Sequence, residues 1–82
     1  MKTRKQVLIS AHDAILGQLV EKEINFISLS RKAIIIKSGK DHVTIQKKLA
    51  ETKGIMENIK GVLIIIEELI MKEENGKEVQ PN

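Results

Sequence analysis

The 82-residue chain contains no cysteine, tryptophan or tyrosine, and Phe26 is its only aromatic residue. The absence of cysteine excludes disulfides and thiol chemistry. A core without aromatic side chains must be built from Ile, Leu, Val and Met, which is typical of helical bundles and coiled coils. So small a chain usually needs disulfides, a bound metal or a partner chain to be stable. With disulfides excluded, we expect a partner chain.

Long hydrophobic runs are also missing. The longest spans residues 62–66 and ends at Glu67 and Glu68, whereas a membrane span needs about 20 apolar residues. The short run at residues 7–9, which follows Lys2, Arg4 and Lys5, is too short for the apolar region of a signal peptide. We therefore expect a soluble protein of the cytoplasm.

Residues that carry catalytic or metal chemistry are few. The only imidazoles, His12 and His42, lie outside any cluster with the spacing of metal ligands. Ser10, His12 and Asp13 share the letters of a hydrolase triad but lie too close in sequence and lack an oxyanion loop. No glycine-rich phosphate loop is present. The sequence thus predicts no enzyme, no cofactor and no small-molecule ligand.

What the chain has in abundance is heptad periodicity. In two segments, apolar residues recur in alternating steps of three and four, the spacing of one helix face. This pattern predicts two long helices, about 5–37 and 42–73, in an all-α antiparallel hairpin that assembles into a helical bundle with a second chain. The apolar seam residues are Leu8, Ile15, Leu19, Phe26, Leu29 and Ile36 in the first helix, and Ile45, Leu49, Met56, Ile59, Leu63, Ile66 and Ile70 in the second.

A four-residue connection, 38–41, joins the two predicted helices. Gly39 can adopt the left-handed conformation that closes a helix, and Asp41 is a suitable N-cap for the second helix. A connection this short makes the helices antiparallel neighbours. Folding the chain at Gly39 pairs Leu8 with Ile70 at the far end. We expect a hairpin domain at 1–74 and a polar flexible tail at 75–82, with its Asn-Gly pair and single proline.

The first helix has two weaker points. The segment from Ser10 to Asp13 resembles a capping box, so the helix could instead begin near Ala11. Ser28 and Ser30 could interrupt it, in which case the isoleucines at 34–36 would suit a strand. Because no period-two alternation surrounds those isoleucines, we prefer a continuous helix.

Apolar residues also occur in surplus outside the seam. A two-helix hairpin buries one stripe per helix, so a second stripe stays in water and usually marks a partner surface. A helical wheel places the second stripes of the two helices on different flanks of the hairpin. We expect this surplus surface to bind another copy, as a homodimer or larger assembly, or the helix of another protein. Its residues are Leu16, Val20, Ile24, Ile27 and Ile34 in the first helix, and Ile55, Val62, Ile65 and Leu69 in the second.

The net charge of +3 is unevenly distributed. Residues 1–40 carry eight Lys/Arg and three acids, whereas residues 41–82 carry six Lys and eight acids. This imbalance favours attraction between the two helices, but a basic face could also bind phosphates. The basic residues that would contact nucleic acid in that case are Arg4, Lys5, Arg31, Lys32, Lys37 and Lys40.

Together these features predict a non-enzymatic protein-binding module, such as a small helical adaptor, chaperone or inhibitor of bacterial or phage type. It would act as a homo-oligomer or bound to a partner helix. The alternative is a basic helical dimer that binds DNA or RNA through phosphate contacts.

Overall fold

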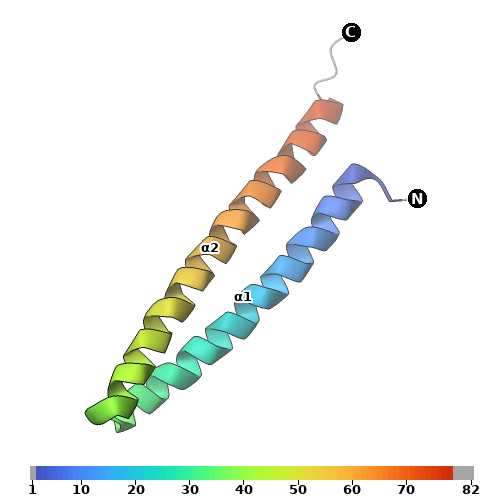
Figure 1. Cartoon of the computed structure of the whole chain (residues 1–82). Helices are drawn as coiled ribbons and strands as arrows, with labels where there is room; N and C mark the ends of the chain where they lie inside the picture. The colour runs from blue at the N-terminus through green and yellow to red at the C-terminus, as the bar shows by residue number, and fades with distance from the viewer. Residues whose placement is uncertain (1, 79–82) are drawn as a thin grey trace.

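The structure, a computed structural model, describes residues 2–78 and consists of two helices, α1 (Arg4–Ile35) and α2 (Gly39–Glu78). They run antiparallel and pack against each other along their length as an elongated hairpin (Figure 1). No strand occurs among residues 2–78. The predicted all-α hairpin is therefore confirmed. The hairpin has a turn end, at the connection, and an open end, where α1 begins and α2 ends.

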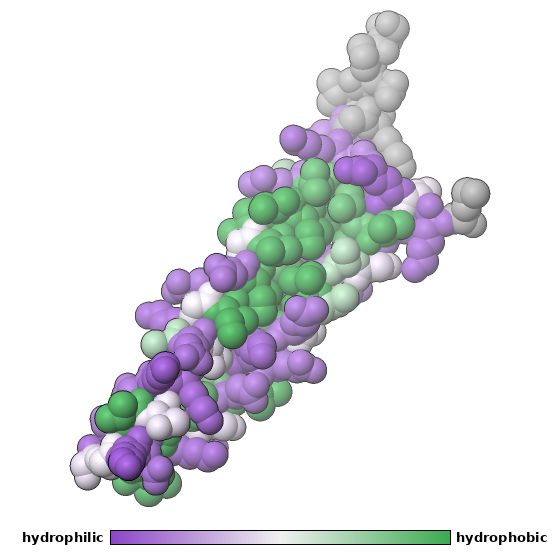
Figure 2. Space-filling model, viewed as in Figure 1, coloured by the Kyte–Doolittle hydropathy of each residue, from purple (hydrophilic) through white to green (hydrophobic). Residues whose placement is uncertain are grey.

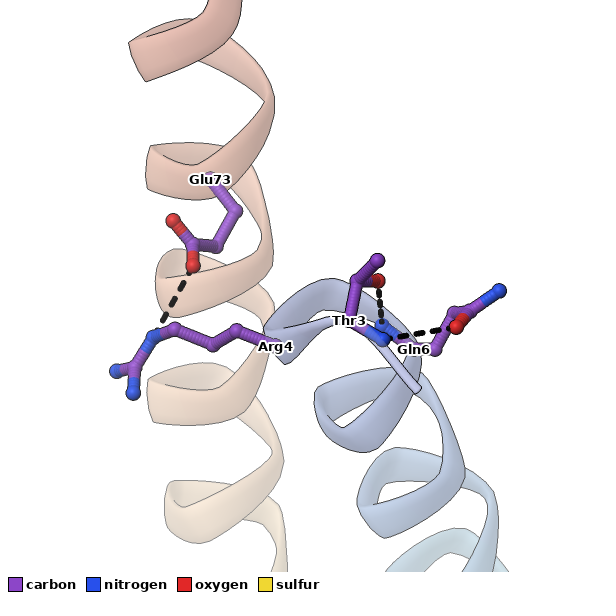
Figure 3. A network of polar contacts seen from close by, with 4 residues as sticks. All are labelled: Thr3, Arg4, Gln6 and Glu73. Carbon is purple, nitrogen blue, oxygen red and sulfur yellow. Dashed lines mark hydrogen bonds and ion pairs between the residues drawn. The ribbon is translucent and has the colours of Figure 1, made fainter. Parts of the chain in front are cut away.

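Helix α1 begins with a capping box formed by Thr3 and Gln6. The Gln6 backbone N–H donates to the Thr3 hydroxyl at 3.2 Å, and the Thr3 N–H donates to the Gln6 side-chain oxygen at 2.9 Å (Figure 3). These bonds satisfy two of the amides that a helix start leaves without partners. The alternative start near Ala11 is wrong, because α1 is already helical from Arg4.

Helix α1 is continuous through its serine positions. The Ser30 hydroxyl donates to the Phe26 carbonyl, one turn earlier, at 2.8 Å, so its polar group is satisfied within the helix. Ile34 and Ile35 are helical, and the strand considered for this segment is wrong. The helix ends at Ile36, an extended C-cap whose N–H donates to the Lys32 carbonyl.

The connection turns at Gly39, whose φ of +87° favours glycine. Gly39 opens α2, whereas the sequence placed it at the close of the first helix. Asp41 is not the N-cap that we expected: it lies in the first turn of α2, where a carboxylate still suits the positive end of the helix dipole. The His42 Nδ1 donates to the Ile36 carbonyl at 3.0 Å, which ties the start of α2 to the end of α1.

Helix α2 extends beyond its predicted end near residue 73 and runs to Glu78. Residues 75–78, which the sequence assigned to a flexible tail, are thus helical, and residues 79–82 lie outside the described part of the chain. Near the open end, α2 carries acidic side chains alongside the start of α1. Arg4 Nε lies 3.1 Å from a Glu73 carboxylate oxygen, and Lys5 Nζ lies 2.9 Å from one of Glu74 (Figure 3 shows the first pair).

The core is the line of contact between the two helices. Leu19, Ile45, Leu63 and Ile66 are its buried residues, each 7–8% exposed. Among residues 2–75 no side chain is less than 2% exposed. The other apolar seam residues are half-buried: Leu8, Ile15, Phe26, Leu29, Ile36, Leu49, Met56, Ile59 and Ile70. A lone hairpin therefore has a narrow core with little fully dehydrated apolar surface.

Candidate interaction surfaces

The seam leaves two long sides of the hairpin free, and both carry apolar side chains. Helical geometry assigns each residue to a side, because positions three and four apart share a face. We call one side the Val62 flank, for its apolar stripe on α2, and the other the Leu16 flank, for its stripe on α1. The Val62 flank carries Ile55, Val62, Ile65 and Leu69, and the Leu16 flank carries Leu16, Val20, Ile27 and Ile34.

The sequence-predicted partner residues are thus divided between opposite sides of the hairpin. All of them are exposed except Leu69, which is half-buried. Ile24 lies on the outer face of α1, opposite the seam, and is 59% exposed. The structure therefore brings them together as two surfaces, and no single surface holds the whole set.

The Val62 flank is apolar in its open half and polar in its turn half. Figure 2 shows this side as a continuous hydrophobic area that spans both helices near the open end and gives way to hydrophilic residues toward the turn. From α1, the open half also receives Val7, Ala11 and Ala14. Toward the turn, the groove between the helices is lined by Asn25, Ser28, Leu29, Lys32, Lys48, Glu51, Thr52 and Ile55.

The Leu16 flank has a narrower apolar surface. A shallow groove near the open end is lined by Ile9, His12, Glu67, Ile70 and Met71. His12 Nε2 lies 3.0 Å from a Glu67 carboxylate oxygen across that groove. On α2, this side also carries charged Lys53 and Lys60, so its apolar stripe lies mainly on α1.

Sequence reasoning missed several exposed apolar residues. Ile64 is 55% exposed although it lies inside the apolar run at 62–66, because only Leu63 and Ile66 of that run face the seam. The heptad count already assigned Leu63 and Ile66 to the seam, so the same count places Ile64 outside it. Ile35 is 81% exposed beside the C-cap, and no local pattern marks it. The others are Val7, Val43 and Met71.

The basic residues proposed for nucleic-acid contact lie at the two ends of the hairpin. Arg4 and Lys5 at the open end are paired with Glu73 and Glu74. The remaining four, Arg31, Lys32, Lys37 and Lys40, lie near the turn and are exposed. Residues 28–50 carry six Lys/Arg and one acid, Asp41. Positive charge is therefore concentrated at the turn end.

Within residues 2–78, no group of three or more His, Cys, Asp or Glu side chains is placed to hold a metal ion. Of the letters that suggested a triad, His12 is directed to Glu67 on the other helix. Neither helix, over the described residues, contains an apolar stretch of the length that crossing a membrane requires. Comparison with protein-family models, curated proteins and solved structures finds no match to this chain.

Proposed function

We propose that this chain is a non-enzymatic protein-binding module, of the adaptor, chaperone or inhibitor kind, that binds helical surfaces of other protein chains through its apolar flanks. It acts as a homo-oligomer or with a partner helix. The observation that carries the proposal is the balance of burial. Among residues 2–75, four apolar side chains are buried, whereas fourteen large ones are exposed.

The surface area supports the same proposal. The chain exposes 6511 Å², whereas a compact monomer of its mass, 9.2 kDa, exposes about 4,900 Å². Transferring one exposed Val, Leu or Ile side chain from water into an interface contributes about 1.5–3 kcal/mol. Two apolar flanks in a chain with so small a core are therefore more stable when covered by another protein. The proposal keeps the cytoplasm as the compartment, because a chain without cysteine needs no oxidising environment.

The test uses charge to disrupt the flank without touching the seam. In the double variant Val62→Glu/Leu69→Glu, two carboxylates would have to be buried in the interface, which is costly without partners. We expect light scattering to show a smaller species than the wild-type chain, and circular dichroism to show helix retained at high concentration. The matched control, Thr44→Glu/Gln46→Glu, adds the same charge at exposed polar positions and should leave the assembly unchanged.

A contrary result would be a wild-type chain that is monomeric at micromolar concentration and does not bind any protein from its host. A double variant with the same mass as wild type would show that the Val62 flank is not a binding surface.

The basic turn end favours a second candidate, binding of DNA or RNA by phosphate contacts. Such binding weakens steeply with salt, because each neutralised phosphate releases counterions. The test is a mobility-shift assay with duplex DNA, single-stranded DNA and structured RNA at about 50 and 200 mM salt, the range over which phosphate-driven binding falls sharply. Tight binding that is lost at high salt, and abolished in Arg31→Ala/Lys32→Ala/Lys37→Ala, would replace our first proposal with this one.

A further inference from the structure

The open half of the Val62 flank has features suited to a second copy of itself. Its α1 side is built from small residues, Ala11 and Ala14, and its α2 side from the larger Val62, Ile65 and Leu69. The outward positions in the middle of this half are uncharged, and they are residues 7, 11, 14 and 18 on α1 and residues 58, 62, 65 and 69 on α2. Arg4 and Lys72 border them at the open end, and Glu21 borders them toward the turn. We call the larger side chains of α2 the ridge and the smaller side chains of α1 the strip. Both are uncharged and belong to the hydrophobic area shown in Figure 2.

We propose that two copies of this chain pair through the open halves of their Val62 flanks, with the α2 ridge of each copy on the small-residue strip of α1 of the other. This arrangement rests on the proposed protein-binding function and names the partner for one flank. It requires a two-fold axis parallel to the hairpin, which places open end beside open end. All neighbouring helices are then antiparallel, as in a four-helix bundle.

The residues match in size and polarity at each level of this arrangement. Rotation about a two-fold axis parallel to the hairpin does not change the position of a residue along the hairpin. The register between α1 and α2 within one hairpin therefore also determines which residues of the two copies lie near each other. That register follows from the antiparallel seam and from the Arg4–Glu73 and His12–Glu67 contacts. Shifted by two residues from that register, which is about 3 Å along a helix, the four layers pair Val7 with Leu69, Ala11 with Ile65, Ala14 with Val62, and Gln18 with Asn58 of the other copy. In this register the small residues of α1 lie against the large residues of α2 in the other copy, and the amide side chains lie against each other.

Area and charge are consistent with pairing that is limited to the open half. Each separate hairpin exposes 6511 Å², whereas a compact protein of twice the mass exposes about 8,200 Å² in all. Far more surface is therefore available than the roughly 1,600 Å² that a standard stable interface buries. At the turn end the same side carries Lys32, Lys48 and Glu51, and burying these charged groups in a dry interface would be costly.

The Leu16 flank is less suited to a second copy. Near the open end its apolar stripe on α1 adjoins Ile70 and Met71 of α2, but farther along α2 it is bordered by Lys53 and Lys60. Two such flanks face to face would bring these lysines into a dry interface, where unpaired charge is costly.

Disulfide mapping tests the arrangement, since the chain has no cysteine of its own. Chains carrying Ala14→Cys are mixed with chains carrying Val62→Cys and mildly oxidised, and each variant is also oxidised alone. We expect the mixture to give a disulfide-linked dimer band several-fold stronger than either variant alone. Leu16→Cys, on the opposite flank, should remain unlinked under the same conditions.

Three outcomes overturn this arrangement. Strong self-linking of Val62→Cys would place α2 on α2, and strong self-linking of Leu16→Cys would move the contact to the other flank. An unlinked mixture whose chains still associate in light scattering would refute the pairing and leave the protein-binding function intact. A chain that does not associate with itself or with any other protein would refute both the pairing and the protein-binding function.

A second variant tests the strip without relying on oxidation. Ala14 is exposed in the separate hairpin, so Ala14→Leu leaves the seam untouched and fills the space that receives Val62. We expect it to weaken the dimer at least tenfold, because overpacking a close-packed interface typically costs about 1–3 kcal/mol. The matched control, Ala50→Leu, is at an exposed position outside this strip and should not change dimerisation. Equal dimerisation of both variants would contradict the proposal.

Discussion

Replacing three of the glycines within the helices by alanine tests whether the outer faces of the hairpin are free. Gly17, Gly54 and Gly61 lie opposite the seam, and a Cβ built on any of them meets nothing within 4 Å. Alanine is more favourable than glycine in a helix interior by about 0.8–1 kcal/mol per residue. The triple variant should therefore gain roughly 2–3 kcal/mol if no other chain packs on these faces.

The assay is thermal unfolding by circular dichroism at one fixed chain concentration, with light scattering on the same samples. Because 1 kcal/mol shifts the Tm of a domain this size by about 4–8 °C, the triple variant should unfold at least ~8 °C higher. The matched control is Gly39→Ala. Gly39 has a φ of +87°, so alanine there should lower the Tm. A lower Tm or a smaller assembly in the triple variant would refute the reasoning, because it would show that the outer faces are in contact with another chain.

Two further predictions concern the seam and the cap. Ile66→Ala, at a buried seam position, should lower the free energy of unfolding by about 2 kcal/mol or more. Ile64→Ala, at a position that is 55% exposed, should lower it by less than about 1 kcal/mol. Equal losses in urea unfolding would contradict the assignment of Ile66 to the seam and Ile64 to the surface. Thr3→Ala removes the N-cap and should lower the free energy of unfolding by about 1 kcal/mol. Ser10→Ala, inside α1, should cause no measurable loss of stability. A larger loss for Ser10→Ala than for Thr3→Ala would show that the helix begins later than described.

The helices themselves could be predicted because the heptad spacing extends without interruption over nine positions in each segment. A pattern that long outweighs local signals such as Ser28 and Ser30, whose hydroxyl bonds can be made within a helix. The ends were less predictable. Thr3 and Gln6 form the capping box, although Ser10 carries a similar signal, and only the tertiary structure shows which one caps a helix.

The charge contacts could not be predicted either. Arg4 and Lys5 appeared to be free for phosphate binding, and they pair with Glu73 and Glu74 because α2 extends alongside them to the open end. This depends on the relative lengths of the two helices, which end signals determine only loosely. The two apolar flanks, in contrast, could be predicted, because helical spacing alone places the surplus residues of α1 and of α2 on opposite sides of the seam.

The most direct test of the central claim, that the hairpin is completed by another protein chain, is the concentration dependence of its thermal unfolding. A folded state that forms by association is stabilised by mass action, so its Tm rises with chain concentration. We expect the Tm of the purified chain to rise steadily between about 5 and 500 μM, in parallel with the loss of monomer in sedimentation. A cooperative transition with the same Tm across that range would show a hairpin that is stable alone, and would contradict the account.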